Sequence, residues 1–400
     1  GIIMAFKNKF IVGAFAAASF ALAAGGAQAD GVKIGFLSDL TGASSVLSGE
    51  SSVTAIKMAI EDSGDVLGKP VELVVADQLN KPDVGLAIAR QWIDTEGVTA
   101  ILDVNNSAVA LAVNDLTTEK NIIFLDGGST TKLTNENCSV TTTQWIIDTY
   151  GLARAIALPL VKAGNDNWFF ITVDYAFGHD LEAKGIAAVE SAGGKVVGTV
   201  RHSPQTTDYS SFLLEAQSKG AKTIALATFG SYMINIIKQA REFGMDVKMV
   251  PFFMAMTDIK SIGLENLKNV SGGIMFYWDR NDKTRAWSKR YEERFGRPAT
   301  FSNAQQYNAV IHYLKAVKAA GTTEAKAVAA KMLELPVEDQ TDVSAYVRKD
   351  GRVARDMYSF DVKTPEESKG EWDVMKITAT ADKEDVTLPL SESKCPLVNK

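Results

Sequence analysis

Cysteine and histidine are scarce in this chain, and that scarcity excludes several kinds of chemistry. The 400 residues include only two cysteines and three histidines, which leaves little material for metal binding or thiol catalysis. The 42 basic residues are outnumbered by 48 acidic ones, so the formal net charge is -6 and no basic field attracts a phosphate backbone. We therefore expect no metal, no other cofactor and no nucleic-acid partner.

Long apolar runs are also absent, apart from one near the amino terminus. Residues 10–24 are mostly apolar, follow a short positive region and precede the small-residue site Ala27-Gln28-Ala29. This pattern is typical of a secretory signal peptide. A membrane anchor is the alternative, but the run is shorter than the ~20 residues that span a bilayer. We expect residues 1–29 to be a cleaved signal peptide and the mature protein to lie outside the cytoplasm.

In an oxidising compartment the two cysteines can form a disulfide. Cys138 and Cys395 have one intramolecular pairing, which would link the carboxyl-terminal residues to the middle of the chain. The chain-entropy model gives such a long closure about 4 to 5 kcal/mol of stabilisation. Two unpaired thiols are the alternative.

The remaining sequence alternates β-branched runs with amphipathic stretches. Strands are predicted over residues 32–37, 71–76, 100–104, 122–125, 168–173, 195–200, 223–227 and 248–252. Between them apolar residues recur at helical spacing, as at Val53, Ile56 and Ile60. Repeated strand-helix-strand order predicts an α/β fold with parallel sheets covered by helices on both faces, the doubly wound architecture.

The alternation restarts around residues 140–150, with four strand-helix units on each side. Two doubly wound lobes of similar size are therefore predicted. Residues 282–335 are expected to be almost wholly helical, and residues 346–377 to form short strands around the turn pair Asp350-Gly351. Lobes without a flexible linker meet at a cleft, and open parallel sheets bind ligands at the carboxyl ends of their strands.

No motif assembles a catalytic constellation. The sequence has no nucleophile elbow, no phosphate-binding loop, no His-Glu-x-x-His and no close pair of His or Cys. His179 as a base and Asp174 as an acid are the basis of an alternative hydrolase hypothesis. A surface histidine and an aspartate that caps the helix at Tyr175 are the simpler interpretations. The sequence favours a binding protein with no catalytic residue.

Two loops that follow predicted strands suit an anionic ligand. Asn105-Asn106-Ser107 precedes a predicted helix, so side chains and free backbone N–H groups converge at a helix N-terminus. The segment 126–131 repeats this arrangement, with glycines that let a ligand approach the backbone. A simple cap and turn is the alternative in each loop. The candidate ligand-binding residues here are Asn106, Ser107, Gly127, Gly128 and Ser129.

Aromatic side chains gather at predicted strand ends and loops. Aromatics in such positions are often core residues, but their number fits the wall of a pocket. The candidates are Tyr175, Phe177, Phe229, Phe253 and Trp278, together with Leu47 on the loop of residues 43–48.

Several short segments, in their order along the chain, resemble a known family. They include Val32-Lys-Ile-Gly-Phe-Leu37, Asp174-Tyr-Ala-Phe-Gly178, Asp208-Tyr-Ser-Ser-Phe212 and Ile237-Lys-Gln-Ala-Arg-Glu-Phe-Gly244. The chain resembles type I periplasmic solute-binding proteins of the branched-chain amino-acid class, which serve ABC importers. Gln144-Trp145, Asp148-Thr-Tyr150 and Cys395-Pro396 resemble the subset that takes up benzoate-type aromatic acids.

This resemblance implies a monomer with two lobes that are joined by three crossings of the chain and close on a small-molecule ligand. It also implies an inner-membrane ABC permease as partner. The expected lobes are residues 30–147 plus 279–343 and residues 148–278 plus 344–385, with residues 386–400 as a tail held by the disulfide. The positions that match the carboxylate-holding residues of the family are Asn106 or Ser107, Gly127 and Ser129, and Phe177 and Phe229 match its aromatic wall.

One departure from the family pattern concerns the ligand. In amino-acid binders an acidic side chain after the strand that matches residues 248–252 pairs with the ligand ammonium, but Phe252–Met256 holds no carboxylate. An unpartnered buried ammonium is costly. The sequence therefore favours a small organic acid with an aromatic or hydrophobic body. An amino-acid or amide binder, or a sensor of the same fold, is the alternative.

Overall fold

The first lobe is built on a five-stranded sheet of the order β2-β1-β3-β4-β5, in which every pair is parallel. The computed structural model describes residues 30–398, and the predicted signal peptide lies outside them. The strands are β1 (Lys33–Ser38), β2 (Glu72–Asp77), β3 (Ala100–Asp103), β4 (Ile123–Asp126) and β5 (Thr142–Gln144). The helices are α1 (Ser45–Ser48), α2 (Glu50–Ser63), α3 (Pro82–Thr95), α4 (Ser107–Lys120), α10 (Asp282–Phe295), α11 (Phe301–Ala320) and α12 (Ala325–Glu334).

Helices cover both faces of this sheet. Phe36 of β1 belongs to the core that includes α2 residues, whereas its neighbour Leu37 belongs to a separate core with α3 and α4 residues. Alternate side chains of a strand point to opposite faces, so the two cores lie on opposite sides of the sheet. Strands buried in this way need continuous apolar sequence, which is why their runs could be recognised.

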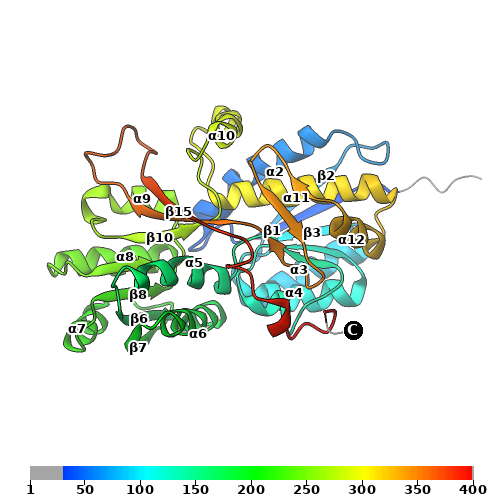
Figure 1. The fold of residues 1–400 in the computed structure, drawn as a ribbon. Helices are drawn as coiled ribbons and strands as arrows, with labels where there is room; N and C mark the ends of the chain where they lie inside the picture. The colour runs from blue at the N-terminus through cyan, green and yellow to red at the C-terminus, as the bar shows by residue number, and fades with distance from the viewer. Residues whose placement is uncertain (1–29, 399–400) are drawn as a thin grey trace, which may run out of the picture.

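The second lobe repeats this design with the parallel order β7-β6-β8-β9 (Figure 1). Its strands are β6 (Asn167–Val173), β7 (Lys195–His202), β8 (Thr223–Ala227) and β9 (Lys248–Pro251). Its helices are α5 (Thr149–Lys162), α6 (Ala176–Ser191), α7 (Ser210–Ser218), α8 (Gly230–Glu242) and α9 (Met256–Ile262). An antiparallel sheet of β10 (Ser271–Ile274), β14 (Met357–Val362) and β15 (Met375–Ala381) lies beside β9.

The structure confirms the α/β class and all eight predicted strands, with ends that differ by at most two residues. It adds β5, whose three residues are polar and therefore form no apolar run. The helical stretch over residues 282–335 is confirmed as α10 to α12. Between residues 30 and 398, no helix is both long and apolar enough to cross a membrane.

Residues 145–148, 275–281 and 355–356 connect elements of the first sheet and its helices to elements of the second lobe. Before the third passage, β11 (Val337–Glu338), β12 (Ser344–Val347) and β13 (Val353–Ala354) form a small antiparallel sheet, which includes the expected turn at Asp350-Gly351. A bridge joins Gln144 to Arg352, so this sheet lies against the first lobe. The buried Arg352 thereby holds the hairpin beside β5, on the carboxyl-terminal side of the boundary that is predicted between residues 343 and 344.

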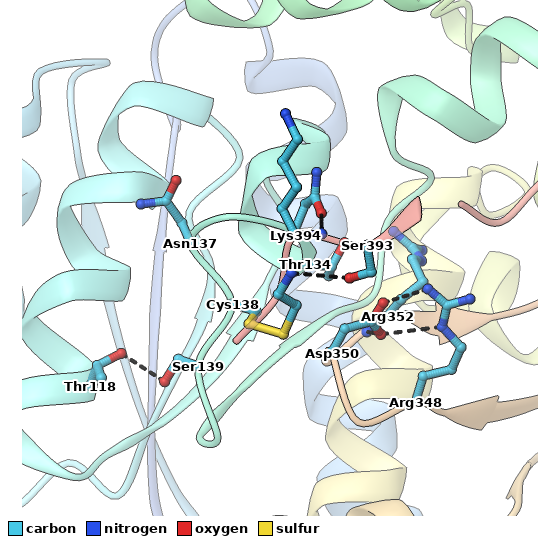
Figure 2. Close-up of a disulfide and its surroundings, with 12 residues drawn as sticks. Thr118, Thr134, Asn137, Cys138, Ser139, Arg348, Asp350, Arg352, Ser393 and Lys394 are labelled. Atoms are coloured by element: carbon cyan, nitrogen blue, oxygen red, sulfur yellow. Dashed lines mark hydrogen bonds and ion pairs between the residues drawn. A yellow bond between two sulfur atoms is a disulfide. The ribbon is translucent and has the colours of Figure 1, made fainter. Parts of the chain in front are cut away.

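The carboxyl-terminal tail returns from the second lobe to the first. Arg154 Nε of α5 donates to Asp385 O at 3.0 Å, and Arg348 donates to Leu388 O at 2.9 Å. The tail ends in the predicted disulfide between Cys138 and Cys395, which is present in the structure (Figure 2). The described end of the tail consequently lies beside the first lobe, near α4 (Figure 1).

Removing the disulfide should destabilise the protein. We expect the double variant Cys138→Ser, Cys395→Ser to lose about 2 to 5 kcal/mol of unfolding free energy, because the unfolded chain gains the freedom of an open loop. Chemical denaturation followed by circular dichroism measures this loss. Wild-type protein with a reducing agent is the matched control and should show the same decrease. An unchanged midpoint would mean that noncovalent contacts alone hold the tail.

Candidate functional site

A cavity with an empty volume of about 420 Å³, partly open to solvent, lies between the two lobes. Its residues come mainly from loops after parallel strands, where an open sheet binds ligands. The first lobe and the first crossing contribute Ser44, Leu47, Asn105, Gly127, Ser129, Ile146 and Ser302, and the second lobe contributes Tyr175, Phe177, Phe229 and Phe253. The cavity therefore has one wall rich in small polar residues and one aromatic wall.

The polar wall offers hydrogen-bond donors that the protein does not use. Asn105 Oδ1 accepts from Asp39 N at 3.1 Å and Gln78 Nε2 at 2.7 Å, so these contacts fix the amide with Nδ2 left without a partner in the described structure. Ser129 is 5% exposed, and neither its hydroxyl nor its N–H donates to another described residue. These neutral donors can bind an oxyanion.

The aromatic wall is a cluster of edge-to-face contacts. The Phe177 ring lies 5.7 Å from that of Phe229 at an interplanar angle of 87°, and 5.9 Å from that of Phe253 at 82°. Tyr175 meets Phe229 at 6.3 Å and 78°. Such contacts hold rings in defined positions, so the wall is a preformed apolar surface.

A hydrogen-bond chain fixes the loop that carries Ser129. Gln144 Nε2 donates to Gly128 O at 2.6 Å and Thr130 O at 3.0 Å. Its Oε1 accepts from Arg352 at 2.8 Å. All three side-chain bonds are buried, so Gln144 is a positioning residue for the polar wall.

The two lobes touch beside the cavity. Asp180 of α6 accepts hydrogen bonds from Thr130 Oγ1 and Thr131 N, both at 2.9 Å, and from Thr149 Oγ1 at 2.6 Å. At another point Gly230, with φ +53°, approaches Ala43 so closely that a Cβ would lie 2.8 Å from the Ala43 carbonyl oxygen. The lobes are therefore closed around the cavity, and a side chain at position 230 would separate them.

The structure brings most of the sequence-predicted residues to this cavity. Those that line it are Leu47, Gly127, Ser129, Tyr175, Phe177, Phe229 and Phe253. Those that do not are Asn106, Ser107, Gly128 and Trp278.

The residues that do not line the cavity have structural roles. Asn106 Oδ1 caps α4 by accepting from Ala108 N at 3.0 Å and Val109 N at 3.2 Å. Ser107 is buried as the first residue of α4. A Cβ at Gly128 would meet the α4 side chain of Ala110 at 2.9 Å, and Trp278 donates to Trp372 O at 3.0 Å.

Four residues that line the cavity were not predicted from the sequence. Asn105 belongs to the selected loop, but the helix-cap pattern drew attention to its neighbour. Ser44 belongs to the loop of residues 43–48, from which only Leu47 was predicted. Ile146 has no distinguishing pattern, and Ser302 comes from α11, far along the chain, so only contact in the folded protein identifies these two.

The alternative catalytic pair lies outside the cavity lining. His179 Nε2 and Asp174 Oδ1 are 2.7 Å apart, and both side chains are substantially exposed. The expected capping role of Asp174 is wrong, because Tyr175 occupies the cap position and the aspartate pairs with His179 instead. Within residues 30–398 no group of three or more His, Cys, Asp or Glu could hold a metal.

Two buried carboxyl groups lie behind the polar wall, at the ends of β3 and β4. Asp103 accepts from Ser38 Oγ at 2.6 Å, and a Cβ at Gly127 would lie only 2.2 Å from Asp103 Oδ1. Burial raises the pKa of Asp103 to about 6, and burial also raises the pKa of Asp126 well above its usual range. These groups therefore support the Gly127 loop and resist ionisation.

Comparisons with known proteins agree with this geometry. A sequence model described as "Periplasmic binding protein" matches residues 31–371. A crystal structure of a periplasmic binding protein from Burkholderia mallei is 39% identical with a TM-score of 0.89, covering 92% of this chain and 99% of that one. A Leu/Ile/Val-binding protein homolog 6 from Brucella melitensis is 24% identical over 80% of this chain and 83% of its own length.

A further solved structure shares the fold at low sequence identity. It is the solute-binding protein of an ABC transporter from R. palustris in complex with benzoate. It is 16% identical with a TM-score of 0.79, covering 88% of this chain and 96% of that one.

The buried Asp103 should make stability depend on pH. Because its pKa is higher in the folded than in the unfolded protein, its contribution is present below about pH 4 and is lost as pH rises through about 6. Asn cannot ionise, so we expect the unfolding free energy of Asp103→Asn, relative to that of wild type, to rise by up to about 3 kcal/mol as pH increases from about 4 to 7. Urea denaturation across this range measures the change.

The matched control for this prediction is Asp208→Asn. The pKa of exposed Asp208 is lowered by hydrogen bonds from Ser210, so this group titrates below the tested range. Parallel pH profiles for Asp103→Asn and wild type would contradict the assignment.

Proposed function

This chain belongs to the periplasmic binding protein family, and we propose that it captures a small aromatic carboxylate for an ABC importer. Its similarity to the Leu/Ile/Val-binding type indicates a solute-binding receptor that delivers a small molecule to a permease, and not an enzyme. The family is extracytoplasmic, and we propose that residues 1–29 direct export to the periplasm.

The observation that carries the proposal is that none of the eleven described residues lining the cavity is charged. The ammonium of an α-amino acid would lose its hydration there without gaining a carboxylate partner, which is unfavourable. A carboxylate, in contrast, needs only hydrogen-bond donors. Ser129 and the Nδ2 of Asn105 supply donors that no described residue occupies.

The opposite wall suits an aromatic ring. Phe177 already contacts both Phe229 and Phe253 edge to face. A planar ligand extends such a cluster at little conformational cost. A ring with one carboxylate therefore matches both walls.

Closure of the lobes completes such a site. The polar wall comes from the first lobe and the aromatic wall from the second, so a ligand touches both only when they meet. The hydrogen bonds that Asp180 accepts from Thr130 and Thr131 stabilise that arrangement. We propose that this closed form is the one presented to the permease and that the receptor acts as a monomer.

Calorimetric titration with benzoate, 4-hydroxybenzoate and leucine tests the proposal. We expect saturable one-to-one binding of at least one aromatic acid and none of leucine. Protein unfolded and refolded before titration excludes interference from co-purified ligand. Tight leucine binding without a response to either aromatic acid would refute the aromatic-acid assignment and leave an amino-acid receptor.

Ser129→Ala should weaken binding of the aromatic acid by about five- to tenfold, because one hydrogen bond to the carboxylate is lost. Its unfolding midpoint should not change, since the hydroxyl has no partner in the described structure. Asn106→Ala is the contrasting variant and should lose about 1 kcal/mol of stability with the helix cap. Equal affinities for Ser129→Ala and wild type would show that the carboxylate binds elsewhere.

A further inference from the structure

A second cavity, with an empty volume of about 550 Å³, lies where the chain passes between the lobes. It shares no lining residue with the cleft cavity. Its lining comes from the segment after β10, from the residues before and at the start of β12, and from the third crossing and the start of β14. The polar residues that the proposal uses are Arg280, Asp342, Ser344, Arg355, Asp356 and Tyr358.

Arg355 is a buried cation without a contacting carboxylate in the described structure. Its side chain is among the buried groups, with the residue 7% exposed. Its terminal nitrogens donate to two neutral acceptors, Asn308 Oδ1 and Met275 O, each at 3.2 Å. Its Nε–H is buried and has no partner. Burial lowers the pKa of Arg355 only to about 10, so the group remains charged at neutral pH.

Arg280 places a second guanidinium at the same cavity. It bonds to Asp342 Oδ2 at 2.6 Å, and its plane lies over the Tyr358 ring with the guanidinium carbon 4.4 Å from the ring centre. Its Nε–H is likewise buried and unpartnered. Two arginines thus retain unused donors beside one cavity.

The carboxylates near Arg355 are engaged with other groups. Asp342 accepts from Arg280 and from Asn281 Nδ2. Asp356 accepts from Lys383 N at 2.9 Å and lies 3.4 Å from the Lys383 ammonium.

Asp339, also nearby, accepts from Thr341 and Asn308, and burial raises its pKa. The Arg355 charge therefore has no directly bonded counter-ion within the described chain. Buried arginines with free donors typically bind carboxylate, sulfate or phosphate groups.

We propose that this cavity is a second ligand site, which binds a small oxyanion through Arg280 and Arg355. The hydroxyls of Ser344 and Tyr358 also line it and have no hydrogen-bond partner in the described structure, so they can donate to the same anion. Planar guanidinium groups favour an oxyanion over a halide, because they donate parallel hydrogen bonds to two oxygens. This site is independent of the ligand proposed for the cleft.

Calorimetric titration of the full protein with inorganic phosphate, sulfate or acetate at constant ionic strength tests this site. We expect saturable one-to-one binding of at least one of the three in the millimolar range or tighter, and no heat from chloride beyond dilution. Which oxyanion binds most tightly then distinguishes a tetrahedral from a carboxylate ligand. Binding of chloride with equal affinity, or of none of the oxyanions, would overturn the proposal.

Variants locate the bound anion. Arg355→Met should lose at least about tenfold in affinity, because the unpaired charge is removed. Asp208→Asn changes an exposed residue that lines neither cavity and should bind the anion like wild type. A loss of affinity in Ser129→Ala equal to that in Arg355→Met would place the anion in the cleft and overturn the proposal. If Arg355→Met fails to fold, the milder pair Ser344→Ala, Tyr358→Phe decides: about three- to tenfold weaker binding supports the site, and unchanged affinity overturns it.

Discussion

The buried guanidinium of Arg352 is the interaction on which the shape of the cleft depends. It donates to Gln144 Oε1 at 2.8 Å and to Ile146 O at 2.6 Å, and it lies 3.8 Å from Asp148. One cation thereby joins the first crossing of the chain to the hairpin that precedes the third. Gln144 also donates to the backbone of the loop that carries Ser129. The contact between Arg352 and Gln144 therefore fixes the position of the polar wall. Removing one partner of such a buried charge strongly destabilises the folded protein.

The division of the cavity into a polar and an aromatic wall explains how closure can be selective. Each lobe alone presents half of the chemistry, so a ligand gains its full interaction energy only in the closed form. A molecule that is wholly polar or wholly apolar would satisfy one wall and leave the other unsatisfied. Selectivity then resides in the difference between open and closed states as much as in any single contact.

The sequence predicted the features that depend on local pattern. The runs at residues 223–227 and 168–173 were recognisable because strands buried on both faces are continuously apolar. Phe177 and Ser129 were found because they follow strands whose carboxyl ends converge. Asn105 was missed in favour of Asn106, since a cap and a ligand donor have the same sequence pattern and only the folded loop separates them.

Features that depend on distant contacts were not predictable. Arg352 bonds to Gln144 although 208 positions separate them in the sequence. No sequence pattern near either residue predicts this contact. The contact of the hairpin with β5 was consequently not predicted. The same limitation applies to Ser302, which reaches the cavity from the start of α11. The disulfide is also a distant contact, but it could be predicted because the chain has only two cysteines and therefore one possible intramolecular pairing.

That disulfide also gives the molecule an unusual connectivity. Residues 138–395 form a covalently closed ring, and the ring contains every strand of the second lobe. A single proteolytic cut anywhere in this ring would leave one connected molecule, whose fragments separate only after reduction. Both ends of the segment that forms the second lobe are thus fixed in the first lobe. The second lobe therefore stays covalently attached after one of its peptide bonds is cleaved.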